Sequence, residues 1–388
     1  MHKKLQTKLE QLHQNGGHRV SRPLSAIGFN VNDAAHPTTL VNFSSNDYLG
    51  LTGDHDLQQT FFKQAGIKKS NWMSSSSARP LTGTSLAHAE LEQYIAKSYE
   101  KSGTLLFNSG YHANTGILPA LTDKKDLVLA DKLVHASLID GLSLGKATFK
   151  RFAHNDMVHL EQLLSKFSKE FDTIWIVTES VFSMDGDIAP LAELVDLKQR
   201  FKACLYVDEA HAVGSLGEQG LGLCVDQNLE QHVDLIVGTF GKSLAGYGGF
   251  VAGDEVFIDA LINFARSWLF STALPPINID WNLFIWQQLS DFRPQRQQLG
   301  HLTSLFKQQL RDAQQDYIGE TYIIPLLKPG NPQVINLANA LSEQGILALP
   351  IRSPTVAKGV ERIRFSLTAN IPETEIQRCV AALVTADA

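Results

Sequence analysis

The chain has 388 residues, which is too long for one average domain and fits one large domain with one smaller domain. Apolar residues make up 44% of the chain and charged residues 19%, as is ordinary for a globular protein with a sizeable core. The formal net charge is −6 and no basic run stands out, which argues against nucleic acid or an acidic membrane surface as a partner.

The cysteines and the N-terminus bear on location. Cys204, Cys224 and Cys379 show no metal-type spacing, and so low and odd a number is typical of the reducing cytosol rather than of a disulfide scaffold. The N-terminus leads into a polar helical pattern instead of an apolar signal core, and no apolar stretch is long enough to span a bilayer. We therefore predict a cytoplasmic protein with no metal site and no membrane partner.

The chain begins with short elements. An amphipathic helix is predicted over residues 2–15, with leucines on one face, and the glycine pair at 16–17 ends it. The simplest role for this helix is a packing arm on a neighbouring domain or subunit. A short strand over residues 40–43 precedes a polar turn, and a second helix is predicted near residues 55–66.

A polar segment from Ser74 to Thr84 follows. Its Ser and Gly content suits a backbone that approaches a ligand closely, but a mobile surface loop explains the same composition equally well. Thr84 or Ser85 can cap a helix that runs to about Tyr99.

From residue 104 onward, strands and helices alternate, which implies an α/β domain with a mainly parallel sheet and helices on both faces. Ligands of such sheets bind beyond the carboxyl ends of the strands, so the polar residues after the strands are candidates for one site. The predicted strands cover residues 104–107, 126–130, 147–152, 173–178, 203–207 and 233–237. The predicted helices open at Gly110, follow His135, and run near 157–168 and 190–200.

The last part of the chain predicts a smaller α+β domain with a short sheet. Pro275 and Pro276 begin a long helical pattern that continues to about residue 315, and short strands alternate with helices after it. We therefore predict an N-terminal segment, a large domain and a small C-terminal domain, over residues 1–45, 46–280 and 281–388.

The stretch 205–249 carries the strongest chemical signal. One apolar strand leads into Asp208, and a second leads into a glycine-rich turn that contains Lys242. A lysine amine can form a Schiff base with pyridoxal 5'-phosphate (PLP), while a carboxylate keeps the pyridinium nitrogen of this cofactor protonated. Each residue alone has a simpler explanation, because an aspartate after a strand is often a helix N-cap and a lysine in a turn is usually solvated. The two together, each after an apolar strand, favour the PLP hypothesis.

A phosphate group needs backbone N–H donors and a favourable helix dipole. Gly110 and Tyr111 open a helix directly after a strand and supply both, and Thr239 adds a hydroxyl group. Without Lys242, an ordinary strand-to-helix turn would be the better explanation for the first two.

Three further polar residues follow predicted strands. The ring of His135 suits stacking on an aromatic cofactor, although a capping or core histidine has the same pattern. His211 lies three residues after Asp208 and suits contact with the phenolic oxygen of PLP, whereas alone it would be a solvated loop histidine. Ser183 suits the same oxygen, although taken alone it is an ordinary turn serine.

With these residues in view, the chain resembles the α-oxoamine synthase family of PLP-dependent enzymes, from about Arg19 to the last helix. The resemblance implies the fold of the aspartate aminotransferase-like (fold type I) PLP-dependent transferases and a homodimer with its active site at the subunit interface. The segments that carry it cover residues 42–51, 82–83, 88, 91–92, 151–156, 180–187, 208–211, 239–242 and 352–355.

The resemblance implies a role for each candidate residue. Lys242 would carry the cofactor and move protons, and Asp208 would pair with the pyridine nitrogen. His211 and Ser183 would line the oxygen side of the cofactor, and His135 and Ala210 would sandwich its ring. The implied catalytic residues are Lys242, His135, Asp208 and His211, and the phosphate contacts are Gly110, Tyr111 and Thr239, with Thr272 from a second subunit.

The resemblance also implies the substrate contacts. Arg364 would take the amino-acid carboxylate, for which a bidentate guanidinium is suited. Arg19 and Thr355 would contact the substrate together with His135, although Arg22 is a rival for the place of Arg19. The form of residues 43–48 is most similar to the members on the route to biotin, which implies L-alanine and pimeloyl-CoA or a pimeloyl carrier protein as substrates.

Two other functions remain open at this point. Family members that use glycine with an acetyl or succinyl thioester share the same core residues, and the sequence does not show the shape of the substrate pocket. A PLP-free binding protein that kept the fold is a second alternative, against which Asp208, His211 and Lys242 all argue.

Overall fold

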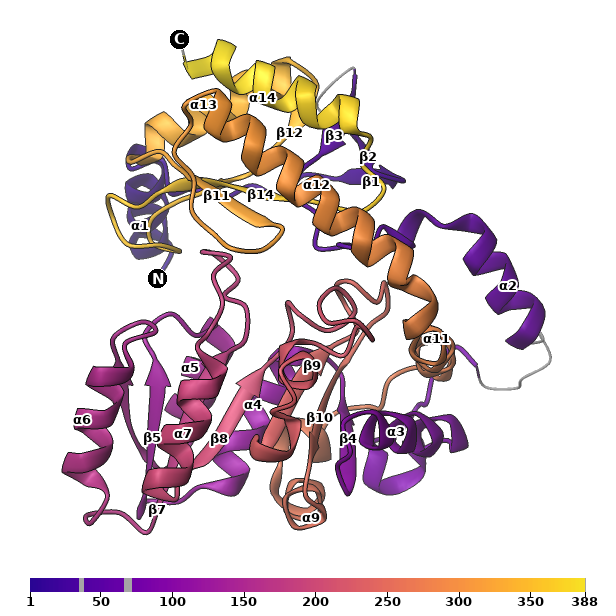
Figure 1. Ribbon diagram of the computed structural model, residues 1–388, viewed down its shortest axis with the longest axis vertical. Helices are drawn as coiled ribbons and strands as arrows, with labels where there is room; N and C mark the ends of the chain where they lie inside the picture. The colour runs from indigo at the N-terminus through magenta and orange to yellow at the C-terminus, as the bar shows by residue number, and fades with distance from the viewer. Residues whose placement is uncertain (35–37, 66–71, 388) are drawn as a thin grey trace. The chain divides into compact units, whose positions relative to one another are not determined.

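The computed structural model describes residues 1–34, 38–65 and 72–387, which divide into two compact units (Figure 1). The first unit consists of residues 1–54, 183–187 and 295–388, and the second of residues 55–182 and 188–294. The predicted segment 1–45 lies inside the first unit, and the predicted boundary after residue 280 falls within a helix. Residue 66, the end of the predicted second helix, lies outside the described residues.

The second unit is built around a seven-stranded sheet in the order β4-β10-β9-β8-β7-β5-β6. The pairs from β9 to β6 are all parallel, as the alternation of strands and helices predicted. The central strands are buried on both faces, which is why they are continuous apolar runs in the sequence. The strands are β4 (Gly103–Phe107), β5 (Asp126–Asp131), β6 (Thr148–Phe152), β7 (Thr173–Glu179), β8 (Cys204–Asp208), β9 (Leu235–Thr239) and β10 (Gly249–Gly253).

Strand β10 was not predicted, and it runs antiparallel to both β9 and β4. Only residues 240–248 separate it from β9, which is shorter than the dozen or so residues that a parallel crossover needs. The chain therefore returns directly along β9. A Cβ atom at residue 249 would lie 2.7 Å from the backbone nitrogen of Gly110. Glycine at this position therefore lets β10 begin in close contact with the helix that starts at Gly110.

Helices and helical turns surround this sheet (Figure 1). Ser85 is the residue that caps α3, because its hydroxyl oxygen accepts a hydrogen bond from the backbone N–H of His88. The helices are α2 (His55–Ala65), α3 (Leu86–Ser98), α4 (Gly110–Leu121), α5 (Ala136–Leu144), α6 (Met157–Phe167), α7 (Leu191–Phe201), α8 (Leu223–Asp226), α9 (Glu255–Phe264), α10 (Arg266–Leu269) and α11 (Pro276–Gln287), with the short turn η3 (Glu230–His232).

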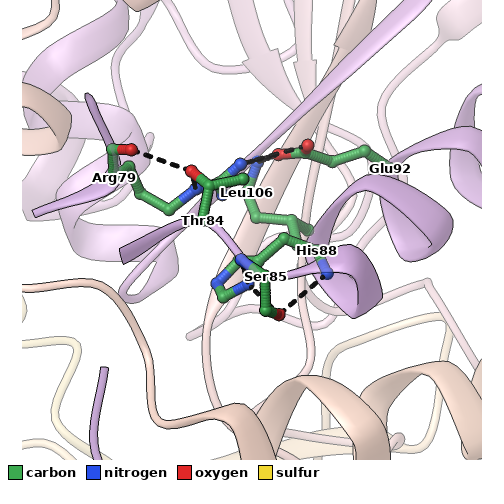
Figure 2. Close-up of polar contacts among 6 residues, drawn as sticks. All are labelled: Arg79, Thr84, Ser85, His88, Glu92 and Leu106. Atoms are coloured by element: carbon green, nitrogen blue, oxygen red, sulfur yellow. Dashed lines mark hydrogen bonds and ion pairs between the residues drawn. The ribbon is translucent and has the colours of Figure 1, made fainter. Parts of the chain in front are cut away.

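The segment 74–84 is anchored by an ion pair at Arg79, which argues against the mobile surface loop as its nature (Figure 2). It contains a helical turn, η2 (Arg79–Gly83). Arg79 donates from Nη2 to both carboxylate oxygens of Glu92, at 2.9 and 3.1 Å, and from Nε to the hydroxyl of Thr84 at 2.9 Å. Glu92 also accepts the backbone N–H of Leu106 in β4 at 3.0 Å.

The predicted long helix to residue 315 is wrong, because it is two helices. A turn of 3₁₀-helix, η4 (Leu289–Phe292), separates α11 from α12 (Arg293–Asp312). Pro294 explains the break, since a proline inside a continuous helix lacks the N–H donor and its ring clashes with the carbonyl four residues earlier. At the second position of α12 the same proline is tolerated.

The first unit contains a four-stranded sheet, β1-β2-β3-β12, and a three-stranded sheet, β11-β14-β13. The N-terminal hairpin of β1 and β2 was not predicted, because every residue of β1 is exposed and the strand has no apolar alternation. The elements are α1 (His2–Gln14), β1 (Leu24–Ile27), β2 (Asn30–Asp33), β3 (Thr39–Asn42), η1 (Leu51–Gly53), most of α12, β11 (Ile323–Leu327), α13 (Asn331–Glu343), β12 (Ile346–Leu347), β13 (Pro350–Ile351), β14 (Arg362–Ser366) and α14 (Glu373–Asp387). In the described ranges, the search for a helix with the length and apolar character of a membrane span found none.

Candidate active site

A cavity of about 160 Å³ lies at the carboxyl ends of the parallel strands of the second unit. The last residues of β7, β8 and β9, which are Glu179, Asp208 and Thr239, all line it. The site is therefore at the edge of the sheet where the alternating pattern predicted it. The lining residues are Gly110, Tyr111, Asn114, His135, Ser137, Glu179, Asp208, Ala210, His211, Thr239 and Lys242.

Most of the predicted cofactor residues come together around this cavity. Three lining residues, Asn114, Ser137 and Glu179, had no predicted role. Asn114 lies one helical turn after Gly110, so the (i, i+4) spacing on α4 was the signal that could have found it. The predicted residues that line the cavity are Gly110, Tyr111, His135, Asp208, Ala210, His211, Thr239 and Lys242.

The carboxylate of Asp208 is buried, with 5% of its surface exposed. Its Oδ1 accepts the backbone N–H of Ala210 at 2.9 Å, and its Oδ2 accepts the side-chain amide of Asn114 at 2.8 Å. Both donors are neutral groups. A buried carboxylate is normally paired with a cation, so a carboxylate that lines a cavity with neutral donors behind it suits a positively charged ligand atom.

The Lys242 turn is held by the helix behind it. Within the turn, Ala245 donates its backbone N–H to the carbonyl of Lys242 at 3.0 Å and adopts a φ of 49°. Trp281 of α11 donates its indole N–H to the carbonyl of Ala245 at 3.0 Å, and Asn282 donates to the carbonyl of Tyr247 at 2.9 Å. These contacts fix the point from which the lysine side chain extends.

The cavity also contains a helix N-terminus. Ser109 caps α4 by accepting the backbone N–H of His112 at 3.1 Å, which leaves the first backbone N–H groups of the helix, at Gly110 and Tyr111, without intrahelical partners. The hydroxyl of Thr239 is beside them, although it already donates to the carbonyl of Gly248 at 2.8 Å. This corner of the cavity suits a phosphate group.

His135 is the N-cap of α5. Its Nδ1 is 2.7 Å from the hydroxyl of Ser137 and accepts the backbone N–H of the same residue at 3.3 Å. Its own backbone N–H donates to Glu179. Partial burial lowers the pKa of His135 below the ordinary 6.5, with the negative charge of Asp208 opposing this and Lys242 adding to it.

The predicted carboxylate-binding arginine lies in the first unit. Arg364 in β14 is 7% exposed, and its Nε donates to the carbonyl of Ser183 at 2.5 Å. Its two Nη atoms face Oδ1 of Asn46 at 3.4 Å, and Nη2 faces the hydroxyl of Tyr48 at 3.4 Å. Ser183 is thus in contact with Arg364 and is not a lining residue of the cavity of the second unit.

The remaining predicted residues lie apart from the cavity of the second unit. Arg19 donates to the hydroxyl of Thr355 in the first unit, which pairs the two predicted substrate contacts. Its rival Arg22 instead forms an ion pair with Asp33 at 3.7 Å. Thr272 does not line the cavity of the second unit, and it forms an isolated antiparallel bridge with Ala78. A search of the described residues found no group of His, Cys, Asp and Glu arranged to hold a metal ion.

The donors and acceptors of the cavity fit PLP. A helix N-terminus suits its phosphate, a buried carboxylate with neutral partners suits its protonated ring nitrogen, and a lysine suits its aldehyde. His135 and Ala210 both line the cavity, as groups that sandwich a ring must.

A family model and known relatives match most of the chain. A family model described as aminotransferase class I and II matches residues 38–383. The putative 8-amino-7-oxononanoate synthase of Pasteurella multocida is 49% identical over 347 residues, covering 89% of each chain. The 8-amino-7-oxononanoate synthase of Haemophilus ducreyi is 48% identical over 353 residues, covering 89% of this chain and 91% of that one.

Solved structures agree as well. Serine palmitoyltransferase from S. paucimobilis, determined with a PLP–myriocin adduct, is 28% identical with a TM-score of 0.90 and coverage of 99% of this chain and 96% of that one. The 8-amino-7-oxononanoate synthase of Francisella tularensis is 27% identical with a TM-score of 0.73 and coverage of 89% and 97%.

Fold and site together define a PLP-dependent transferase of fold type I, as predicted. The chain belongs to the class I and II aminotransferase family and, within it, to the α-oxoamine synthases.

Proposed function

We propose that this enzyme condenses L-alanine with a pimeloyl thioester to give 8-amino-7-oxononanoate, carbon dioxide and the free thiol, a step on the route to biotin. The observation that carries the chemistry is the buried Asp208, which has only neutral hydrogen-bond donors and faces the same cavity as Lys242. The choice of reaction rests on relatives of that name at 47–49% identity over about 90% of the chain.

Each cavity residue then has a task. Bound PLP supplies an electron sink for the negative charge that forms on the α-carbon of the amino acid. The amine of Lys242 holds the cofactor and moves the proton at this carbon, which requires the amine to be neutral at that step. Asp208 accepts a hydrogen bond from the ring nitrogen and so keeps it protonated.

The other cavity residues position the cofactor. We assign its phosphate to the N-terminus of α4 at Gly110 and Tyr111, with Thr239, and its ring faces to His135 and Ala210. His211, which is 6% exposed, is assigned to the phenolic oxygen. Ser183 belongs to the first unit and does not line this cavity, so its assignment to the same oxygen rests on the family resemblance alone.

All but one of the residues that we assign to the substrates belong to the first unit. We assign the carboxylate of L-alanine to the buried guanidinium of Arg364, which Asn46 and Tyr48 hold in place. We assign the acyl substrate to Arg19 and Thr355, whose side chains are hydrogen bonded to each other, together with His135.

A panel of substrate pairs tests this function. We expect 8-amino-7-oxononanoate, identified by mass spectrometry, from L-alanine with pimeloyl-CoA or a pimeloyl carrier protein, and the faster of the two donors identifies the carrier. A glycine C-acetyltransferase or another sibling would turn over glycine with acetyl-CoA or succinyl-CoA instead. Turnover with glycine alone would contradict the biotin assignment and leave the PLP chemistry intact.

We also propose a cytoplasmic homodimer, in which Thr272 completes the phosphate site of the partner. Three large apolar side chains of the second unit, Leu81, Leu86 and Phe270, are 77%, 91% and 72% exposed, as for a surface that a partner covers. The cysteines are unpaired, and burial raises the pKa of Cys204 to about 11, which suits a reducing compartment. Analytical ultracentrifugation tests the dimer, and sedimentation as a monomer at assay concentration would contradict it.

A further inference from the structure

A chain of hydrogen bonds runs behind the cavity from β8 to α5. It begins at the fully buried Tyr206, whose hydroxyl is 2.6 Å from Oδ1 of Asn114. The amide nitrogen of Asn114 reaches both Oδ2 of Asp208 at 2.8 Å and the hydroxyl of Ser137 at 2.9 Å. Ser137 in turn meets Nδ1 of His135 at 2.7 Å. One amide thus contacts both the carboxylate and the chain that leads to the imidazole.

The direction of each hydrogen bond in this chain is determined. An ionised Asp208 can only accept, so the NH₂ group of Asn114 must face it and the amide oxygen must face Tyr206, whose hydroxyl donates. The second amide proton is donated to Ser137, which leaves the Ser137 hydroxyl free to donate to His135. Nδ1 of His135 is therefore an acceptor, in agreement with the backbone N–H that also points at it, and the proton of the neutral ring is on Nε2.

We propose that Asn114 is the positioning residue that fixes the Asp208 carboxylate and, through Ser137, the tautomer of His135. This proposal rests on the proposed function, because it assumes that PLP occupies the cavity. It extends that function by assigning a role to a residue that need not touch the cofactor. Asn114 is 2% exposed, and the distances above account for all three hydrogen-bonding positions that it uses.

The consequence for the cofactor follows from the charge of Asp208. Hydrogen bonds donated to a carboxylate favour its charged form, and a charged Asp208 keeps the proton on the ring nitrogen. Loss of the Asn114 amide removes one of its two donors, so the shared proton moves toward Asp208. The titratable side chains that face this carboxylate or line the cavity with it are Tyr111, His135, Glu179, Tyr206, His211 and Lys242.

The test is ¹⁵N NMR of PLP labelled at the ring nitrogen and bound to the protein, recorded against pH, together with the dissociation constant of PLP. In Asn114→Leu we expect the ring nitrogen to lose its proton at a pH about one unit or more below that of the wild type. We expect the dissociation constant to rise on the order of 10-fold. Tyr206→Phe removes only the hydrogen bond to the amide oxygen of Asn114, which leaves the amide free to rotate. It should change the deprotonation pH and the dissociation constant in the same directions as Asn114→Leu, but by less.

Two further variants separate positioning from stability. Asn114→Leu/Tyr206→Phe removes the buried hydroxyl that the first change leaves unpaired, so it should regain thermal stability without regaining the wild-type titration of the ring nitrogen. Tyr99→Phe removes an equally buried hydroxyl, which donates to the carbonyl of Leu221 at 3.0 Å away from the cavity. It should lower stability and leave the ring nitrogen unchanged.

Three results would overturn the proposal. One is wild-type PLP affinity and ring titration in folded Asn114→Leu. Another is a double variant in which titration recovers along with stability, since the role of Asn114 would then be structural. If Asn114→Leu does not fold, an unchanged titration in Tyr206→Phe overturns it instead. A wild-type protein that binds no PLP would contradict the proposed function itself, and this outcome is visible before any variant is made.

Discussion

Two carboxylates of the second unit, Glu92 and Asp208, are withdrawn from water in different ways. Glu92 accepts two hydrogen bonds from the guanidinium of Arg79, so its charge is paired inside the fold (Figure 2). Burial raises its pKa, and Arg79 opposes that shift. Asp208 accepts hydrogen bonds only from neutral amides and lines a cavity. A buried charge that is paired within the fold therefore costs stability when its partner is removed, whereas a charge held by neutral donors is available to a ligand.

The largest effect is expected at Lys242, which has no counterpart in the Glu92 cluster. Lys242→Ala should lower kcat with L-alanine by on the order of 10⁴-fold, because both the covalent attachment and the proton transfer are lost. Lys101→Ala is the control, since that amine donates to the carbonyl of Val233 and not into the cavity. A variant at Lys242 that kept more than about a tenth of kcat would contradict the assignment.

Breaking the paired carboxylate should cost stability. Glu92→Gln leaves the charge of Arg79 without its partner, so we expect the free energy of unfolding in urea to fall by about 3 kcal/mol. The absorbance of bound PLP should stay as in the wild type. The double variant Arg79→Met/Glu92→Leu should regain most of the loss, because neither charge is then buried alone. If Glu92→Gln changed the PLP spectrum but not stability, the comparison would fail.

Neutralising Asp208 should have the opposite effects to Glu92→Gln, with a loss of activity and no loss of stability in the protein without PLP. Asp208→Asn should lower kcat/KM by about 10²-fold, because the ring nitrogen loses its anionic partner. Without PLP, the free energy of unfolding should be equal or higher, since a buried charge with neutral donors has been removed. Urea denaturation of the apo and PLP-bound forms measures both effects, and a loss of apo stability like that of Glu92→Gln would contradict it.

The smallest effect, when taken over a single pH unit, concerns His88 in the cluster of Figure 2. Burial, aided by the charge of Arg79, lowers its pKa from 6.5 to about 3. The unfolded chain therefore binds a proton below pH 6.5 that the native state does not bind. Stability is lost as the pH falls from 6.5 toward 3, by about 1.4 kcal/mol per pH unit.

A non-titrating side chain tests this pH dependence. His88 completes a capping box with Ser85, and glutamine at the same position can complete it too. His88→Gln should therefore keep the helix cap. Between pH 6 and 4 it should reduce the slope of the free energy of unfolding against pH by the contribution of about one proton, which is about 1.4 kcal/mol per pH unit. His301→Gln, at an exposed histidine that faces Glu373 at 2.9 Å, is the matched control. Equal slopes for wild type and His88→Gln would contradict the account.

The sequence predicted those parts of the site that depend on local pattern. Asp208 and Lys242 each follow an apolar strand, so their place at the edge of the sheet could be inferred from the alternation. The role of Asn114 could not be predicted, because it depends on Tyr206 of β8, which is far away in the chain and meets α4 only in the folded protein. Strand β10 was missed for a related reason, since the short return after β9 breaks the alternating pattern.

The sequence also could not predict which side chains from distant segments contact each other. The resemblance named Ser183 and Arg364 separately, and the hydrogen bond from Arg364 to the carbonyl of Ser183 appears only in the fold. The resemblance named Arg19 with Arg22 as a rival, and only the structure shows that Arg19 meets Thr355 while Arg22 pairs with Asp33. Contacts between distant segments carry no local signal, which is why these assignments needed coordinates.

The most direct test of the central claim is reduction of the protein with sodium borohydride in the presence of PLP, followed by peptide mass mapping. Reduction converts the C=N bond between a lysine and PLP into a stable C–N bond, so the cofactor stays on the residue that held it. The account predicts one modified peptide, with the label on Lys242 and none in Lys242→Ala. A label on another lysine, or no label at all, would contradict the assignment of this cavity as the cofactor site.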